Sequence, residues 1–445
     1  MAKEIKAGDV KAINRELLDF INESPDAYHA VENMADMLTK AGFTRLYEND
    51  EWKIKPGNAY FTIRDGSSLI AFKMAKDKVY NGFQIMAAHS DSPTFKVKPS
   101  SEITVEDKYI KLNTEKYGGM IMYTWLDRPL SVSGRITVDS GDEIKTKLVK
   151  LDKDVLIIPS LAIHMDRTLN DGYTFNAQKD MLPLFAGKTD KKRTLMSLIA
   201  KEAKVKEEEI LDADLYLYNR VKGTFLGADG EFIASARLDD IQCAFTAVKS
   251  IIDAEVTKSV SVCAIFNNEE VGSSTKQGAA SSFLECVLER INASCGKSET
   301  EFKRTLVNSF LLSADNAHAV HPNHTDKADP TNRPYMNGGI VIKYNANQKY
   351  TSDAVSGGIF KKISKKAGVP IQTYVNRSDI AGGSTLGSIA VSRVSMNSVD
   401  IGLPQLAMHS AYETAGAHDT LYLYLAAKTF FESSITVTKD GNYKI

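Results

Sequence analysis

The chain has 445 residues, more than one hydrophobic core normally supports, so we expect two domains or one domain with a large insertion. Its 55 basic and 56 acidic side chains give a formal net charge of -1, which argues against a nucleic-acid binder held by bulk electrostatics. No apolar run approaches the ~20 residues that span a membrane, and the sequence begins without the apolar core of a signal peptide. These features predict a cytoplasmic protein whose partner is small, with neither nucleic acid nor membrane involved.

The first ninety residues predict two helices and then strands. Apolar residues recur at helical spacing over 13–21 and again over 30–38, and a Ser-Pro-Asp helix start lies between the two stretches. Strand-like runs follow at 59–63, 68–72 and 82–88. The last of these runs stops at His89, which is a potential metal ligand.

His89 and Asp91 lie two residues apart at the end of that run. Side chains two apart on a strand point to the same side, so Asp91 could accept the second ring N–H of His89 or steer the histidine from behind. Taken alone, the segment also fits a histidine with satisfied hydrogen bonds in a protein core. The pair therefore becomes informative only together with other ligands.

The pattern of apolar and polar residues changes twice after His89. From about residue 96 to 233, short alternating runs with frequent Gly and Asp turns predict a β-rich insertion. After Asp239, helical stretches alternate with buried strands, a pattern that calls for a mostly parallel sheet covered by helices. We therefore expect an α/β fold, with a mostly parallel or mixed sheet sandwiched by helices. The catalytic domain would be split into 1–97 and 233–445, and the β-rich domain inserted at 98–232.

Two adjacent carboxylates, Glu269 and Glu270, follow the buried run 260–266. Successive strand residues point to opposite faces, so one glutamate could hold a metal while the other handles protons. A solvated loop is the alternative if the pair stands alone. It does not stand alone, because the chain carries further potential ligands at the ends of apolar runs.

Those further ligands are Asp239 with Asp240, Asp315 and His409. Each follows or ends an apolar stretch, and ligands in open α/β sheets gather beyond the carboxyl ends of strands. Together with His89 and the Glu pair they offer nitrogen and oxygen donors without a thiolate. That inventory suits two divalent metals that share one carboxylate.

Several of these motifs occur in one order that resembles the aspartyl aminopeptidase family of cytosolic di-zinc exopeptidases. The matching segments are His89-x-Asp91, Arg237-Leu238-Asp239, Asn268-Glu269-Glu270-Val271-Gly272-Ser273, Ser313-Ala314-Asp315-x-Ala317-His318 and Gln405-Leu406-Ala407-Met408-His409-Ser410. The resemblance covers nearly the whole chain, including Trp125-Leu126-Asp127-Arg128-Pro129 and the stretch around His164 in the insertion.

The resemblance implies two zinc ions per subunit, although cobalt or manganese could occupy ligands of this kind. The implied ligands are Asp239 for both ions, His89 and Asp315 for one, and Glu270 and His409 for the other. Glu269 would be the general base and Asp91 would orient His89. At Asp240 many relatives have asparagine, and we expect this residue to lie behind the metal ligands.

The resemblance also implies an assembly and a substrate. The insertion would be a dimerisation domain, and dimers would build a hollow tetrahedral dodecamer in which His164 reaches the neighbouring subunit's active site. Lys343 would face an acidic side chain, so the expected activity is removal of an N-terminal Asp or Glu from peptides with a free N-terminus. An aminopeptidase that prefers neutral residues and a di-zinc amidohydrolase are the alternatives within enzymes. A non-catalytic scaffold is the alternative outside them.

Two other segments invite competing interpretations. His318, His321 and His324 recur every three residues, but Pro322 argues against a continuous helix, so we expect local structural roles for them. The glycine-rich stretch 381–387 lacks the Gly-Lys-Ser/Thr ending of a phosphate loop. We expect it to present backbone amides to the substrate.

Overall fold

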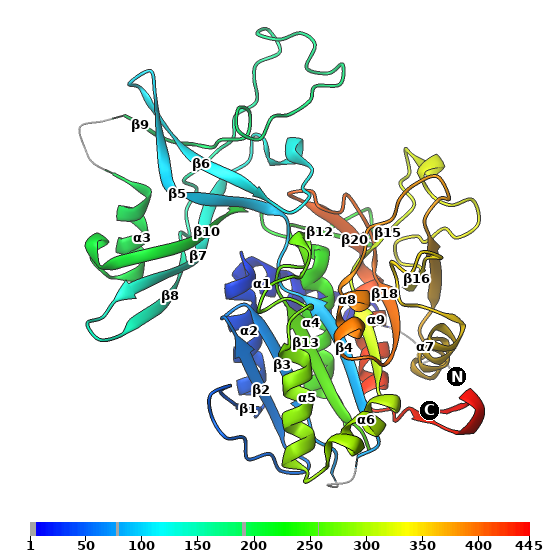
Figure 1. The fold of residues 1–445 in the computed structure, drawn as a ribbon. Helices are drawn as coiled ribbons and strands as arrows, with labels where there is room; N and C mark the ends of the chain where they lie inside the picture. The colour runs from blue at the N-terminus through cyan, green and yellow to red at the C-terminus, as the bar shows by residue number, and fades with distance from the viewer. Residues whose placement is uncertain (1–5, 77–79, 189–192, 257) are drawn as a thin grey trace.

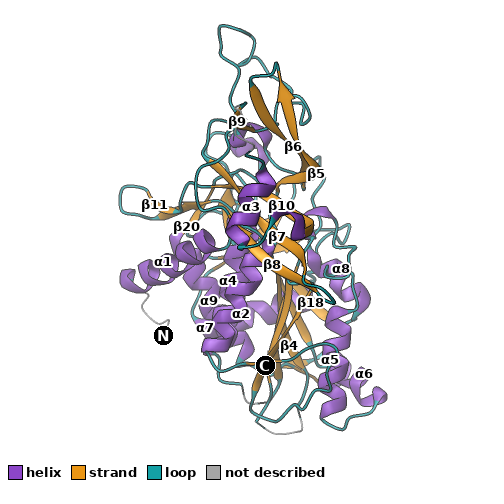
Figure 2. Cartoon of the chain, turned by 90° about the vertical axis from the view of Figure 1, so that its left-hand side faces the viewer, coloured by secondary structure: helices purple, strands orange, loops and turns teal. Residues whose placement is uncertain are grey.

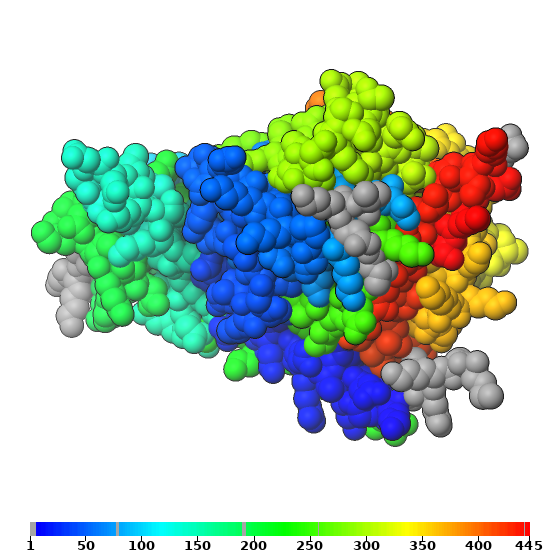
Figure 3. Space-filling view, turned by 90° about the horizontal axis from the view of Figure 1, so that it is seen from below, coloured from blue at the N-terminus to red at the C-terminus, as the bar shows by residue number. Residues whose placement is uncertain are grey.

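The computed structural model describes residues 6–76, 80–188, 193–256 and 258–445. It shows a larger region built on a nine-stranded sheet, from which a six-stranded sheet projects (Figure 1). The view turned by 90° shows helices covering the larger region, whereas the projecting sheet is mostly strands and loops (Figure 2). Seen from below, the residues of the projecting sheet lie at one end of the molecule and the C-terminal segment at the other (Figure 3).

The nine-stranded sheet brings the ends of its central strands to one edge. Its strands lie in the order β1-β2-β3-β13-β4-β14-β18-β16-β17, and neighbours from β13 to β18 are parallel. Their bounds are Thr44–Arg45 (β1), Ala59–Arg64 (β2), Ser68–Lys73 (β3), Phe83–His89 (β4), Val260–Phe266 (β13), Phe310–Ala314 (β14), Ile340–Tyr344 (β16), Ile371–Val375 (β17) and Asn397–Gly402 (β18). In this register Phe266 lies opposite His89, so the residues that follow β13 come out beside the end of β4.

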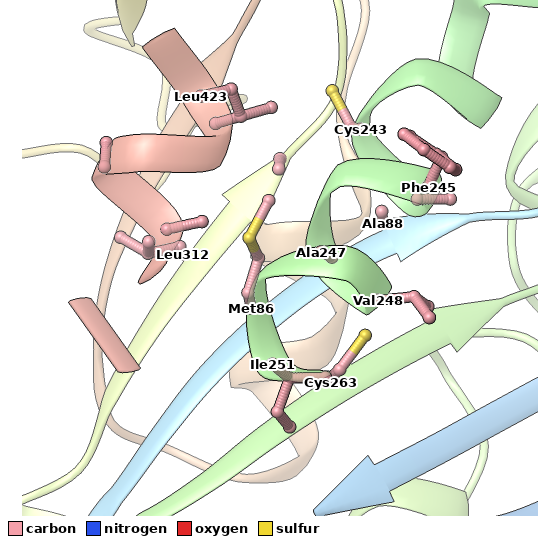
Figure 4. Packing of buried hydrophobic residues seen from close by; sticks show 14 of the residues in the cluster. Met86, Ala88, Cys243, Phe245, Ala247, Val248, Ile251, Cys263, Leu312 and Leu423 are labelled. Carbon is pink, nitrogen blue, oxygen red and sulfur yellow. The ribbon is translucent and has the colours of Figure 1, made fainter. Parts of the chain in front are cut away.

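The sheet is buried on both faces, which explains why its central strands read as continuous apolar runs. Met86 and Ala88 face one core, whereas Ile85 and Ala87 face the other, as the twofold alternation of a strand requires. Figure 4 shows the first of these cores, where Met86 and Ala88 pack against residues of the helix α4.

Helices form the outer layers on the two faces. The first core takes side chains from α1 (Ala7–Glu23), α2 (Ala27–Lys40), α4 (Leu238–Asp253), α7 (Ala354–Ala367) and α9 (Ala417–Phe431). The second takes them from α5 (Phe283–Ser294), α6 (Glu299–Val307) and α8 (Leu386–Arg393). The helices expected over 13–21 and 30–38 are confirmed as α1 and α2, and the expected α/β architecture is confirmed with them. No helix in the described ranges is both long and apolar enough to cross a bilayer.

The projecting sheet has its own core. Its order is β8-β7-β10-β5-β6-β9, and the neighbours are antiparallel. The bounds are Thr94–Val105 (β5), Tyr109–Tyr117 (β6), Leu130–Asp139 (β7), Ile144–Lys150 (β8), Leu184–Gly187 (β9) and Ile210–Asn219 (β10), with the helix α3 at Leu195–Ala203. Leu130, Val132 and Leu215 are among the buried residues of this separate cluster. The segment expected to be β-rich is therefore a sheet with a core of its own.

A five-stranded sheet lies between the two larger ones (Figure 1). It combines β11 (Thr224–Leu226) and β12 (Phe232–Ser235) with β15 (Ala317–His318), β19 (Pro404–Leu406) and β20 (Glu413–Gly416). Strands from both sides of residue 232 thus share one sheet, and the division into 98–232 and the remainder stays a prediction. A short hairpin, β21 (Thr436–Val437) and β22 (Tyr443–Lys444), lies near the C-terminus.

Candidate metal centre

The carboxyl ends of three parallel strands supply most of the candidate site. His89 is the last residue of β4, Asp315 follows β14, and Glu269 with Glu270 forms a short turn just after β13. His89 is 1% exposed and Asp315 is 8% exposed, so both ligands lie inside the fold. The sequence placed these residues correctly, because each apolar run ends where its strand ends.

Asp239 and His409 reach the same place from other elements. Asp239 is the second residue of α4, and His409 follows β19 in a loop where Ala407 and His409 both have positive φ. The strand β19 belongs to the five-stranded sheet, so His409 approaches the site from outside the nine-stranded sheet. The His409 Nε2 atom still lies 3.4 Å from Asp239 Oδ2 and 3.4 Å from Glu270 Oε2.

The potential ligands fall into overlapping groups. Within each group the donor atoms lie within 4.8 Å of one another, and the groups are His89 with Asp239, Asp240 and Asp315; His89 with Glu269 and Glu270; and Asp239 with Glu270 and His409. Asp239 belongs to the first and the third group. Its carboxylate thus lies within reach of His89 and Asp315 on one side and of Glu270 and His409 on the other, which is the position that a ligand shared by two metal ions would need.

The chemistry of the cluster fits divalent metal ions. Among the described residues, Asp239 Oδ1, Asp240 Oδ1 and Glu270 Oε1 are buried and have no hydrogen-bond partner. Buried carboxylate oxygens normally have partners, so these atoms fit a site that binds cations. Carboxylate oxygens and imidazole nitrogens without a thiolate are a donor set that zinc accepts.

Crowding of the carboxylates changes their acidity. Burial, together with the negative charges of Asp315 and Asp91, raises the pKa of Glu269 to about 8. Burial and the charge of Asp239 raise the pKa of Glu270 well above its ordinary value. Burial also acts to raise the pKa of Asp239, but the His409 hydrogen bond and the charges of His89 and His409 outweigh it and lower that pKa. Of these three carboxylates, Asp239 is thus the one most readily ionised, which suits a metal ligand.

Backbone carbonyls orient both histidines. The Nδ1 atom of His89 lies 3.0 Å from the backbone oxygen of Asp91, and the Nδ1 atom of His409 lies 2.9 Å from the backbone oxygen of Gly119. A carbonyl can only accept, so each Nδ1 carries a hydrogen and each Nε2 is left for a metal. Both Nε2 atoms lie within 4 Å of Asp239, at 3.7 Å for His89 and 3.4 Å for His409.

The Asp91 carboxylate lies near His89 and also contacts the glutamate turn, and its predicted role in orienting His89 stays a prediction. Its Oδ1 atom lies 3.4 Å from His89 Nδ1 and accepts the backbone N–H of Glu269 at 3.2 Å. Its Oδ2 atom accepts the backbone N–H of Glu270 at 3.2 Å. One carboxylate therefore ties the end of β4 to the turn that carries both glutamates.

A hollow of about 810 Å³ opens from the metal-ligand cluster and contains Lys343 in its wall. Lys343 lies on β16 and is 3% exposed; its ammonium donates to the backbone oxygen of Asn316 at 2.8 Å and lies 3.7 Å from Asp315 Oδ2. The wall also includes His318, Tyr350, Tyr374, Ser384 and Met408. The glycine-rich stretch contributes Gly383, Ser384 and Thr385 to this wall, and the expectation that it presents backbone amides to a substrate stays a prediction.

His164 and His318 differ in their position relative to the hollow. His164 is exposed in a turn of the projecting region and is not part of the hollow's wall. His318, for which we expected only a local structural role, lines the hollow with its ring 6.1 Å from that of Tyr374. The three-residue spacing of histidines gave no signal for this position, because only the pairing of β15 with β19 brings it there.

Sequence reasoning also missed Glu413. This residue is 1% exposed, and its two carboxylate oxygens accept the backbone N–H groups of His409 at 2.7 Å and Asp239 at 3.0 Å. Burial, followed by the charge of Asp239, raises its pKa to about 8. Glu413 follows no apolar run and no ligand spacing, so the sequence offered no signal for it.

The chain is similar to known proteins over most of its length. Residues 20–431 match the family model described as Aminopeptidase I zinc metalloprotease (M18). A probable M18 family aminopeptidase 2 of Clostridium novyi is 48% identical over 423 residues, covering 94% of this chain and 98% of that protein.

Solved structures agree as well. A chain in the cryo-EM structure of the Ape4 and Nbr1 complex is 37% identical and superposes with a TM-score of 0.93, covering 97% of this chain and 87% of that chain. The mApe1 dodecamer of S. cerevisiae is 29% identical with a TM-score of 0.83, covering 95% of this chain and 97% of that chain.

Proposed function

Because the chain belongs to the M18 family of zinc aminopeptidases, we propose that it releases an N-terminal Asp or Glu from peptides at a site for two zinc ions. The observation that carries this proposal is the position of Asp239, which shares one group of donor atoms with His89 and Asp315 and another with Glu270 and His409. A carboxylate between two such groups is what a pair of ions sharing one ligand requires.

The residues divide the work by position. When bound, zinc supplies a Lewis acid that polarises a carbonyl and lowers the pKa of water. Glu269 would hold the proton taken from the attacking water and return it to the leaving amine, and its pKa of about 8 suits a group that both accepts and donates near neutrality. Asp91 would keep Glu269 and Glu270 in place through its hydrogen bonds to their N–H groups. The surplus of carboxylates would attract the positive α-amine of the peptide.

Lys343 supports the acidic preference. Its ammonium lies in the wall of the hollow, and burial there strengthens attraction to a carboxylate on the first residue of the substrate. A charge-assisted hydrogen bond of this kind contributes roughly 1.5 to 3 kcal/mol. His318 lies in the same wall and could contact the same side chain.

One observation favours a second candidate, an aminopeptidase of the same chemistry that prefers neutral residues. Lys343 already donates to Asn316 O and lies 3.7 Å from Asp315 Oδ2, so part of its charge is balanced inside the protein. Tyr350, Tyr374 and Met408 give part of the wall an apolar surface that suits a neutral side chain.

We further propose that the chain forms homodimers through residues 98–232 and that the dimers assemble into a dodecamer. Exposed apolar side chains at Leu161, Ile163 and Met165 support the formation of homodimers. The similarity of this chain to mApe1, which was solved as a dodecamer, supports the assembly of dimers into a dodecamer. His164 lies among these exposed residues, where it could enter a neighbouring subunit and stabilise the developing oxyanion.

The test is the initial rate of amino-acid release by zinc-loaded protein from matched Asp-, Glu- and Leu-peptides, with an N-acetylated Asp-peptide as the amine control. Preference for Asp and Glu without cleavage of the acetylated peptide supports the proposal. Faster release of Leu would select the second candidate. Cleavage of the acetylated peptide would contradict an aminopeptidase and indicate a di-zinc amidohydrolase.

A further inference from the structure

The segment that follows β6 leaves the projecting sheet and passes directly behind the metal ligands. Gly119 offers its backbone oxygen to His409 Nδ1 at 2.9 Å, and the N–H of Ile121 donates to the backbone oxygen of His409 at 3.0 Å. Gly118 lies so close to Glu270 that a Cβ at this position would come within 3.1 Å of Glu270 Cβ. The segment therefore contacts the ligand loop and the glutamate turn at once.

Tyr117, the last residue of β6, makes the most specific of these contacts. Its hydroxyl donates to Asp91 Oδ2 at 2.7 Å and accepts from the side-chain amide of Asn268 at 2.8 Å. Burial, and then the charge of Asp91, raises the pKa of Tyr117, so the hydroxyl keeps its hydrogen for Asp91. Neither contact is explained by the roles assigned so far, because Tyr117 does not line the hollow where substrate would bind.

Asn268 extends the connection on the other side. It has a positive φ of 61° and immediately precedes Glu269, and its side-chain oxygen accepts from Thr275 Oγ1 at 2.9 Å and Gln277 Nε2 at 2.8 Å. The orientation of Asn268 is thus fixed, and it presents its amide group to Tyr117. The hydroxyl is held between two groups that each adjoin the metal ligands.

We propose that Tyr117 is a positioning residue for the metal centre, acting through Asp91 and Asn268 from the projecting sheet. Its hydroxyl fixes the Asp91 carboxylate, which in turn holds His89 and the N–H groups of Glu269 and Glu270. The placement of the projecting sheet is thereby coupled to the geometry of the ligands. The inference rests on the metal site of the proposed function, but not on which peptide is cleaved.

The experiment compares two tyrosines that flank the same ring. Tyr117 and Tyr28 both pack against Tyr216, with ring centroids 5.7 and 6.5 Å away, but the Tyr28 hydroxyl donates to Asp214 instead of the metal centre. Tyr117→Phe and Tyr28→Phe each remove one hydroxyl and keep the ring. Zinc affinity is measured by competition with a chelator, and kcat and KM are measured at saturating zinc.

We expect Tyr117→Phe to weaken zinc binding by roughly 10- to 100-fold, the usual effect of losing a partner behind a ligand, and Tyr28→Phe to stay within about twofold of the unsubstituted protein. At saturating zinc, Tyr117→Phe should lower kcat and leave KM nearly unchanged. Unchanged zinc affinity and kcat in Tyr117→Phe would overturn the proposal. So would equal losses in both variants, because they would indicate an effect of packing alone.

A double-mutant cycle separates action through Asp91 from a direct effect. In an Asp91→Ala background, Tyr117→Phe should cost much less in zinc affinity than it does in the unsubstituted protein, because only the contact with Asn268 is left to lose. A full additional loss in that background would contradict action through Asp91. Zinc affinity needs no substrate, so this readout stands even if the protein cleaves none of the tested peptides.

Discussion

Two regions hold the candidate metal centre, and they do so by different means. At the carboxyl ends of β4 and β14, His89 and Asp315 are fixed by the packed core of the large sheet. On the other side, His409 stands in a loop of the five-stranded sheet and is held by hydrogen bonds to Gly119 and Glu413. The His89 side chain is 1% exposed and the His409 side chain 31% exposed.

The difference indicates which half of the site depends on the rest of the molecule. The packed core holds the backbone of the strand-end ligands, because close packing leaves few alternative arrangements. The proposed contact of Tyr117 with Asp91 adds to the positioning of the His89 side chain. The loop ligand depends on contacts between separate sheets, and such contacts open locally at lower cost than a core. Substitutions on the two sides should therefore have different signatures. Loss of a contact that supports the loop ligand should release one metal ion more easily than the other, whereas loss of Glu269 should affect the chemistry.

The largest effect is expected at the turn after β13. Glu269→Gln keeps the shape of the side chain but removes the group proposed to carry the proton, so kcat should fall by ~10² to 10⁴. Zinc content, measured by elemental analysis, should be unchanged, because the proposed ligands are all present. Full turnover by a zinc-loaded Glu269→Gln protein would contradict the assigned role.

A smaller effect is expected at the wall of the hollow. Lys343→Gln removes the buried cation that lies 3.7 Å from Asp315, and it should reduce the preference for Asp- over Leu-peptides by roughly 10- to 100-fold. The ratio of kcat/KM for the two peptides measures this directly. An exposed lysine on α7, changed in Lys361→Gln, provides the matched control and should leave the ratio as it was. An unchanged ratio in Lys343→Gln would favour the neutral preference.

The same contrast between the regions explains how much the sequence could predict. His89, Asp315 and the Glu269–Glu270 turn follow apolar runs. A buried parallel strand reads as a continuous apolar run, so the first polar residues after the run mark the end of the strand, where ligands gather. The fold class and the strand-end ligands could be inferred from that pattern. The pattern also named His409 as a candidate ligand, but it could not give the structural setting of this residue. His409 follows a strand of three residues in a different sheet and has a positive φ of 67°.

The residues that hold the candidate ligands from behind, Glu413 and Tyr117, could not be predicted from the sequence for a related reason. Glu413 bonds to the backbone of Asp239, 174 residues away, and Tyr117 bonds to Asn268, 151 residues away. Neither residue stands at a ligand spacing, and both act on groups brought close only by the packing of separate sheets. Roles of this kind depend on long-range geometry, which a hydrophobic pattern does not carry.

Glu413 supports the loop-held side of the site and can be substituted without touching a proposed ligand. Glu413→Gln leaves one acceptor oxygen in place of two, so the N–H of either His409 or Asp239 loses its partner. We expect one zinc ion to bind roughly tenfold more weakly, while the ion beside His89 and Asp315 is retained. Release of zinc to a chelator should then show two separate phases. Equal weakening of both ions would contradict the division between core-held and loop-held ligands.

The smallest expected effect concerns pH and the protein without metal. Burial raises the pKa of Glu269 and Glu413 to about 8, from an ordinary value of 4.5, so the folded metal-free protein binds more protons than the unfolded chain between these limits. The contribution of these two groups to the stability of the metal-free protein is therefore present at low pH and is lost as the pH rises toward 8. Zinc would neutralise the carboxylates, so the difference in Tm between loaded and stripped protein should widen by on the order of a few degrees from pH 6 to 9.

Two variants test whether this pH effect comes from the buried carboxylates of the site. Glu269→Gln cannot ionise at that position, so the stripped variant should lose less stability on going from pH 6 to 9 than the stripped unsubstituted protein. Glu289→Gln, on the exposed face of α5, should behave like the unsubstituted protein. Thermal unfolding of chelator-treated samples at several pH values measures both. A constant Tm difference across this range would show that the carboxylates do not oppose folding when metal is absent, and that the core alone holds the strand-end half of the site together.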